Sequence, residues 1–204
     1  MTNQYNTSAT TGEVRLSYVN LFTAVPPVND PAGKKKFSVT LLIPKTDTET
    51  LSRINAAIQE AARKGVEGAW RGVAPAKLTT PLHDGDGLRE SGEPFGEECK
   101  GHWVMTARSN EDRQPEVVDA QLNPIINQSE VYSGCYARAN IQFYPYGGGD
   151  TGYKKGIGAG LGPVQKLRDG EVLGGGAPAA SSVFDAVTPA FGAGGIDPIT
   201  GLPM

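Results

Sequence analysis

The stretch VYSGCYARANIQFYPY, residues 131–146, decides the expected fold, because apolar side chains alternate in it with polar and aromatic ones. Successive side chains of a β-strand point to opposite faces of a sheet. The odd positions give an apolar set suited to a core: Val131, Cys135, Ala137, Ala139, Ile141 and Phe143. The even positions give a polar and aromatic set without an acid: Tyr132, Tyr136, Arg138, Asn140, Gln142, Tyr144 and Tyr146. We therefore expect a half-buried strand with a tyrosine-rich outer face.

Shorter segments on both sides of this stretch also have the pattern of strands. Residues 12–22 and 34–44 alternate and are bounded by Pro, Gly, Asn and Asp, which are turn residues. In the first segment Tyr18 and Phe22 share a face with Val14 and Leu16, so we expect both rings to pack in the core. Residues 101–109, 115–128 and 160–170 supply further candidate strands. Several short strands favour a small barrel over a doubly wound sheet.

One helix is expected among these strands, over residues 46–64. Thr46 and Glu49 fit a capping box, and Gly65 follows as a stop signal. The apolar stripe of this helix consists of Leu51, Ile54, Ile58 and Ala61. The fold class expected is thus mainly β: an OB-fold-like small barrel with one covering helix and a flexible C-terminal tail.

Composition divides the chain into three parts. Residues 1–12 are polar and are expected to form a disordered arm, residues 13–169 the barrel domain, and residues 170–204, rich in Gly, Ala and Pro, a flexible tail. The net charge is −3, and no Lys or Arg follows Arg168, so the mildly acidic tail accounts for the whole excess. A neutral body can carry a local basic stripe. The two cysteines, with no signal peptide and no membrane-length apolar run, predict a soluble, cytoplasmic protein.

The outer face of residues 131–146 has the chemistry of a single-strand binding surface. Aromatic rings stack on any base, and arginine pairs with phosphate or stacks on a base. The following loop, residues 147–156, adds Tyr153, Lys154 and Lys155, and the lysine run Lys34, Lys35 and Lys36 is a further candidate for phosphate contact. The competing interpretation is that another protein layer buries these tyrosines, since tyrosine is also a common strand residue.

Enzyme and metal motifs are incomplete. The soft metal ligands His83, Cys99, His102 and Cys135 lack the paired spacing of a zinc site, and Asp84 with Asp86 gives only the start of a calcium loop. KKGIGAGLG, residues 154–162, matches no phosphate-binding motif, and its glycines are interpreted as hinges. We expect a protein that is not an enzyme and has no cofactor or metal. A metal-dependent enzyme using His83, Asp84 and Asp86 is the opposing hypothesis.

The chain resembles a family of tailed-bacteriophage single-stranded-DNA-binding proteins with an OB-type fold. The segments that carry the resemblance are residues 15–22, 34–45, 81–87, 131–146 and 154–175. The resemblance implies sequence-independent binding and protection of single-stranded DNA during phage DNA replication or recombination, in the cytoplasm of the infected bacterial host. It implies DNA contact by Tyr132 and Tyr136 and a basic loop at Lys154 and Lys155.

The end of the chain departs from this family. Many such proteins end in a dense acidic tip, whereas this chain ends in GGIDPITGLPM. The tail is compatible with docking a replication protein, or with plain disorder. Duplex DNA or RNA could be bound more weakly, and no membrane is expected as a partner. The alternative function is a structural or scaffold protein of a phage particle, which would use the tyrosines and the tail for assembly.

Overall fold

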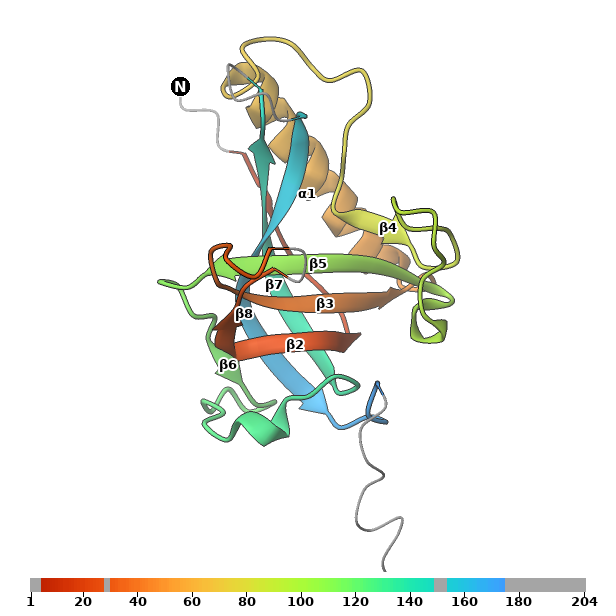
Figure 1. The fold of residues 1–204 in the computed structure, drawn as a ribbon, viewed down its shortest axis with the longest axis vertical. Helices are drawn as coiled ribbons and strands as arrows, with labels where there is room; N and C mark the ends of the chain where they lie inside the picture. The colour runs from red at the N-terminus through yellow and green to blue at the C-terminus, as the bar shows by residue number, and fades with distance from the viewer. Residues whose placement is uncertain (1–4, 28–29, 149–153, 175–204) are drawn as a thin grey trace, which may run out of the picture. The chain divides into compact units, whose positions relative to one another are not determined.

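Five strands close into a barrel in the computed structural model, which describes residues 5–27, 30–148 and 154–174 (Figure 1). They are β2 (Val14–Val25), β3 (Lys36–Pro44), β5 (His102–Asn110), β8 (Gly156–Arg168) and β7 (Tyr136–Tyr146). Each pairs with the next in this order, and β7 pairs with β2 to close the ring. The β5–β8 pairing is parallel and the other four are antiparallel. This mainly β fold is the OB-type barrel that the sequence predicts.

The core forms where the alternation predicts it. The six apolar residues at odd positions from Val131 to Phe143 are all buried, whereas Ser133 is only partly buried. They pack with the inward side chains of β2, β3 and β5, among them Leu16, Leu41 and Met105. The regular strand begins only at Tyr136, because residues 131–135 form a bend that carries Gly134 at a φ of 122°.

Residues 7–11 pack against the barrel, whereas the sequence predicts a disordered arm over residues 1–12. Ser8–Thr10 form β1, which pairs with β7. Thr7 and Thr11 are buried, and the Thr11 hydroxyl accepts a hydrogen bond from the Ala139 N–H at 3.0 Å. The strand forms because β7 extends past β2 and leaves backbone groups that β1 satisfies. The remaining small elements are β4 (Leu82–Asp84), β6 (Val117–Val118), and the 3-10 helices η1 (Glu97–Cys99) and η2 (Gln128–Glu130).

The helix α1 spans Thr48–Glu67 and lies beside β7, β8 and β1 (Figure 1). Its N-cap is Asp47, whose carboxylate accepts the Thr50 N–H, so the predicted capping box at Thr46 is wrong. Gly65 is also not the stop, since it is buried inside the helix. A Cβ there would lie 2.8 Å from both Pro145 and the Trp70 ring, so close packing explains this glycine. Among the described residues, no helix has the length and apolar character needed to cross a membrane.

A β-bulge in β2 reverses the predicted orientation of Tyr18. Ser17 pairs with Thr40, and the next pair is Asn20 with Ser38. Between these pairs β2 contains three steps along the chain and β3 only two, so β2 carries one extra residue. Leu16 is buried before the bulge and Leu21 after it. The side chains that point into the core therefore change from even to odd positions. Tyr18 is therefore 63 % exposed rather than packed in the core.

Candidate nucleic-acid interface

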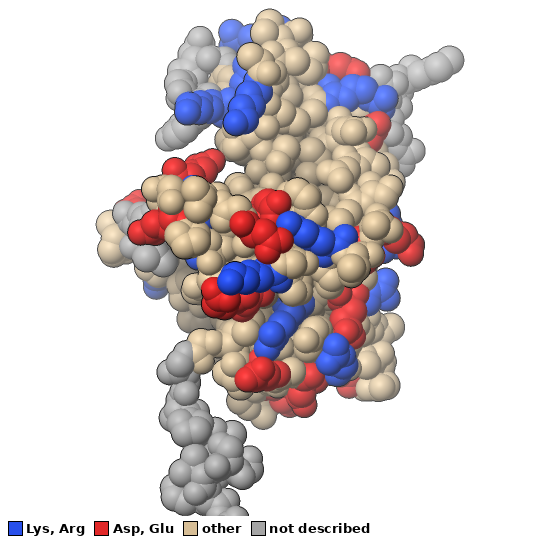
Figure 2. All heavy atoms as spheres, turned by 90° about the vertical axis from the view of Figure 1, so that its right-hand side faces the viewer, with Lys and Arg blue, Asp and Glu red and all other residues tan. Residues whose placement is uncertain are grey.

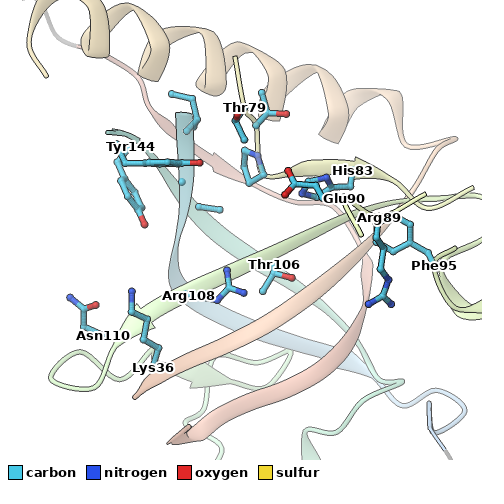
Figure 3. Close-up of a pocket in the computed structure, with 16 residues that line it drawn as sticks. Lys36, Thr79, His83, Arg89, Glu90, Phe95, Thr106, Arg108, Asn110 and Tyr144 are labelled. Atoms are coloured by element: carbon cyan, nitrogen blue, oxygen red, sulfur yellow. The ribbon is translucent and has the colours of Figure 1, made fainter. Parts of the chain in front are cut away.

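The outer face of β3 and β5 forms the floor of a groove made of two joined hollows. One hollow, of about 420 Å³, extends from Tyr18 over Pro26 and Pro27. The other, of about 570 Å³, extends to Tyr144 and Tyr146 (Figure 3). Both are lined by Lys36, Arg89, Thr106 and Arg108. These shared residues make one continuous groove, which we call the β3–β5 groove.

The floor of the groove consists of hydroxyl side chains. Ser38 and Thr40 come from β3 and Thr106 from β5, at positions that alternate with buried core residues. The hydroxyl oxygens of Thr40 and Thr106, which are cross-strand partners, lie 2.9 Å apart. Hydroxyls both donate and accept hydrogen bonds and can rotate. The floor can therefore form hydrogen bonds with either donors or acceptors of a ligand.

Three cations occupy the junction of the two hollows. Arg108 and Arg89 are exposed, and Lys36 is partly exposed. In the described part of the chain, none of the three forms an ion pair with a carboxylate. Arg89 lies over the Phe95 ring, 5.1 Å from its centroid, at the end of the larger hollow away from Tyr144 (Figure 3). The charges are therefore available to an anionic ligand.

The rings of Tyr144 and Tyr146 pack against glycines of β8. Their cross-strand partners are Gly158 and Gly156. A Cβ would lie 2.5 Å from the Tyr144 ring at Gly158 and 2.6 Å from the Tyr146 ring at Gly156, so each ring rests against the backbone of its partner. The rings remain 46 % and 39 % exposed. Gly156 and Gly158 thus lie within a strand and leave room for an aromatic ring on the neighbouring strand. Their interpretation as hinges is wrong.

Tyr132 and Tyr136 lie outside the groove and contact the end of β8 and the segment that follows it. The Tyr132 hydroxyl donates to the Gly170 carbonyl at 2.9 Å. The guanidinium of Arg168 stacks on the Tyr136 ring at 3.5 Å and pairs with Glu13 at 2.6 Å. Both tyrosines are half-buried by these contacts.

Three other residues of the predicted face lie beside β1. Arg138 donates to the Thr11 carbonyl at 3.2 Å, and the Asn140 amide donates to the Thr10 hydroxyl at 2.9 Å. Gln142 donates to the Thr7 hydroxyl. None of these three lines either hollow of the groove. The predicted face is therefore divided: its last two tyrosines enter the groove, and its earlier members bind other parts of the chain.

Among the predicted lysines, Lys36 lines the groove itself, and the other described ones lie outside its two hollows. Lys34 and Lys35 line a neighbouring hollow with Lys36, Glu111 and Asp112. Lys154 lines a hollow with Lys77, and this hollow shares Thr79, His83 and Glu90 with the larger hollow of the groove. Lys155 donates to the Val73 carbonyl at 2.7 Å. Tyr153 lies outside the described residues.

The residues considered for metal chemistry have other contacts. Lys45 binds Asp84 at 2.5 Å and Asp86 at 2.6 Å, and these hydrogen bonds lower the pKa of both carboxyls. Cys99 and Cys135 are buried and unpaired, and burial raises the pKa of both thiols. Within the described residues, no three His, Cys, Asp or Glu side chains gather as a metal site would require.

Four important residues of the groove were absent from the predicted contacts: Tyr18, Arg89, Phe95 and Arg108. Tyr18 was assigned to the core because the pattern carries no sign of the bulge. Arg89 and Phe95 lie in the irregular region 66–100, where no periodicity indicates which side chains meet a strand. The turn residues at 85–87 were the available signal that a loop returns here toward β5.

Comparisons with known proteins find relatives of this chain. The family model described as "Enterobacter phage Enc34, ssDNA-binding protein" matches residues 7–190. Putative protein p50 of Acyrthosiphon pisum secondary endosymbiont phage 1 is 32% identical over 178 residues, covering 84% of this chain and 89% of that protein.

Two solved structures are similar. The single-stranded DNA-binding protein of bacteriophage Enc34 in complex with ssDNA has a TM-score of 0.66 and 28% identity, over 82% of this chain and 89% of that one. The single-stranded DNA-binding protein gp2.5 of bacteriophage T7 has a TM-score of 0.56 over 87% of this chain and 94% of that one, and at 14% identity it supports the fold alone. Because the family model spans most of the sequence, the chain belongs to the Enterobacter phage Enc34 ssDNA-binding protein family.

Proposed function

We propose that this protein binds single-stranded DNA in the β3–β5 groove. The observation that carries the proposal is the junction of the two hollows, where three cations without carboxylate partners lie between exposed tyrosines. Oligonucleotides bind OB-folds on the corresponding face, between the loops that border it. Here those loops join β2 to β3 and β7 to β8, and their described residues are 26–27, 30–35, 147–148 and 154–155.

Each part of the groove suits one part of an unpaired strand. Arg108, Arg89 and Lys36 meet phosphates, which supply most of the affinity and its salt dependence. The exposed faces of Tyr144 and Tyr146 stack on bases, an interaction that tolerates any sequence. The hydroxyl floor has no fixed donor and acceptor pattern, so it too discriminates little between bases. The binding is therefore sequence-independent.

Membership of the family supports the biological role that we propose. The protein coats and protects single-stranded DNA during phage DNA replication or recombination, in the cytoplasm of the infected host. It acts by binding rather than by catalysis, and the description of its relatives as ssDNA-binding proteins supports the binding.

The candidate contacts separate into three groups by position. Tyr144, Tyr146 and Lys36 line the groove, so they are the primary contacts. Lys34, Lys35, Lys154 and Lys155 lie at its edges and would meet a longer strand, as would Tyr153. The third group would touch DNA only if the strand continued past the groove, over β7: Tyr132, Tyr136, Arg138, Asn140 and Gln142.

The test is a binding titration with a labelled oligo-dT, followed by fluorescence anisotropy at low salt. We expect Arg108→Gln combined with Tyr144→Leu to weaken binding about tenfold or more, the loss expected for one stacked base and one phosphate contact. The thermal midpoint should change little, because both side chains are exposed.

The matched control is Arg53→Gln on α1, since Arg53 is exposed, pairs with Glu49 and lines neither hollow. This control should bind as the unaltered protein does. An unaltered protein that fails to bind oligo-dT, or a control that loses as much affinity as the groove variant, would refute the proposal. Duplex DNA and RNA of equal length, added as competitors, measure the preference for single-stranded DNA.

A further inference from the structure

Tyr18 has an unusual backbone conformation for its residue type and position. Its φ is 47°, in the left-handed region, and it lies inside strand β2. Residues other than glycine, asparagine and aspartate seldom adopt this region, and a bulky aromatic residue does so at a cost in free energy. Glycine at this position would remove that cost.

Contacts from distant parts of the chain hold the bulge in place. The Val19 N–H donates to the Ser133 hydroxyl at 3.3 Å. The Asn20 amide donates to the Tyr18 carbonyl at 3.3 Å and to the Ser38 hydroxyl at 3.4 Å. The bulge is thus a supported feature of the barrel, as bulges beside binding sites commonly are.

The effect of the bulge is to place an aromatic ring at the edge of the groove. Without it, Tyr18 would point inward with Val14 and Leu16. With it, the side chain lines the smaller hollow together with Pro26 and Pro27. The described residues that line this hollow include Lys36, Arg89 and Arg108 and no acid. A strained, exposed ring beside three cations has no evident role in stabilising the fold, which indicates a ligand.

We propose that Tyr18 forms a second stacking subsite for an unpaired base, at the end of the groove away from Tyr144 and Tyr146. This inference rests on the proposed function and adds a ligand contact to it. Tyr18 lines only the smaller hollow and the other two tyrosines only the larger one, while the three cations line both. One strand therefore places bases on rings at both ends and phosphates on the cations between them.

The strain provides the test, because it separates binding from stability. Tyr18→Gly removes the ring and relieves the left-handed backbone. We expect its affinity for oligo-dT to fall about 5- to 100-fold, the range for one stacked base. Its thermal midpoint should stay unchanged or rise. Tyr18→Phe should recover most of the lost affinity, since a phenyl ring also stacks.

Tyr18→Asn is a second variant of the same kind, because asparagine tolerates the left-handed region. An oligonucleotide that carries 5-iodouracil gives a direct readout by photocrosslinking. We expect the crosslink in the tryptic peptide 16–34, whose only tyrosine is Tyr18.

The outcomes distinguish this inference from the proposed function. If the unaltered protein does not bind oligo-dT, the proposed function fails. If Tyr144→Leu weakens binding but Tyr18→Gly and Tyr18→Asn do not, only the subsite is refuted. Loss of affinity that merely follows a lower thermal midpoint in both variants also refutes it, as does a crosslink placed on Phe22 rather than Tyr18.

Discussion

At the scale of single residues, the smallest side chains determine where the largest ones lie. Tyr144 can rest on β8 only because residue 158 has no Cβ, and Tyr146 depends in the same way on Gly156. Aromatic rings commonly cover cross-strand glycines in this manner. The binding rings are therefore positioned by residues that no ligand need touch.

We predict that Gly158→Ala weakens oligo-dT binding about three- to tenfold, a part of the free energy of stacking one base. The new Cβ would displace the Tyr144 ring from its position against β8. The check is a double-mutant cycle measured by anisotropy, in which Gly158→Ala is also made in a Tyr144→Ala background. There it should have little effect on affinity. Equal losses in both backgrounds would show that Gly158 acts independently of the ring.

At the scale of elements, an ion-pair cluster fixes the segment between β4 and β5 to the end of β3. Lys45 follows β3 and binds Asp84 of β4 and Asp86 beyond it, and Asp86 also accepts the Gly101 N–H at 2.9 Å. The same segment carries Arg89 and Phe95 to the groove. The cluster thus connects the barrel to a loop that supplies binding residues.

This cluster predicts a pH dependence of stability. Hydrogen bonds from Lys45 lower the pKa of Asp84 and Asp86 below the ordinary value of 3.8. A carboxyl group whose pKa is lower in the folded state stabilises the fold at any pH above its pKa in the unfolded state. This contribution is lost as the pH falls through the pKa of the folded state. The thermal midpoint of Lys45→Met should therefore lie below that of the unaltered protein near neutral pH and approach it in acid.

Thermal melts followed by circular dichroism from about pH 7 to about pH 2 measure this difference. Lys100→Met is the matched control, because Lys100 pairs with Glu97 on the exposed surface and such pairs contribute little. Midpoint curves of Lys45→Met and the unaltered protein that stay parallel down to the lowest pH would contradict the prediction.

At the scale of the whole molecule, local charge rather than net charge decides the affinity for DNA. The chain carries a net charge of −3, and on the face drawn in Figure 2 basic and acidic side chains intermingle. Single-stranded DNA releases about 0.7 counterion per neutralised phosphate. The three groove cations alone predict a slope of about −2 in a plot of log K against log salt, and each edge lysine that also contacts a phosphate makes it steeper by about 0.7.

Anisotropy titrations over a series of salt concentrations give this slope. Arg108→Gln should make it shallower by about 0.7, the contribution of one phosphate contact. Arg53→Gln should leave it as it is. A slope near zero for the unaltered protein would mean that the three cations do not meet phosphates.

Local pattern predicted most of the barrel. The alternation of residues 131–146 identified the core face of β7 correctly, and the apolar stripe placed α1. The N-terminal strand was missed because β1 has too few residues to show a period, and it forms by pairing with Asn140 and its neighbours. The bulge at Tyr18 was missed because its support from Ser133 comes from 114 residues away.

The site was predicted less well than the fold, for a physical reason. Tyr136 and Tyr144 look equivalent in the sequence, since both lie on the outer face of one strand. Their difference comes from what β8 presents to each: Arg168 stacks on Tyr136, whereas Gly158 leaves the outer side of the Tyr144 ring open. Which ring is free depends on cross-strand neighbours, and a pattern within one strand does not contain that information.

The burial of both cysteines has a practical consequence for following this protein at work. Thiolates rather than thiols react with maleimides, and burial keeps Cys99 and Cys135 protonated and inaccessible. A cysteine introduced at an exposed position of α1, such as Ser52→Cys, would then be the preferred point of attachment for a dye. Because the native cysteines would take up little dye, individual labelled molecules can be followed as they bind to and dissociate from a stretched single strand of DNA.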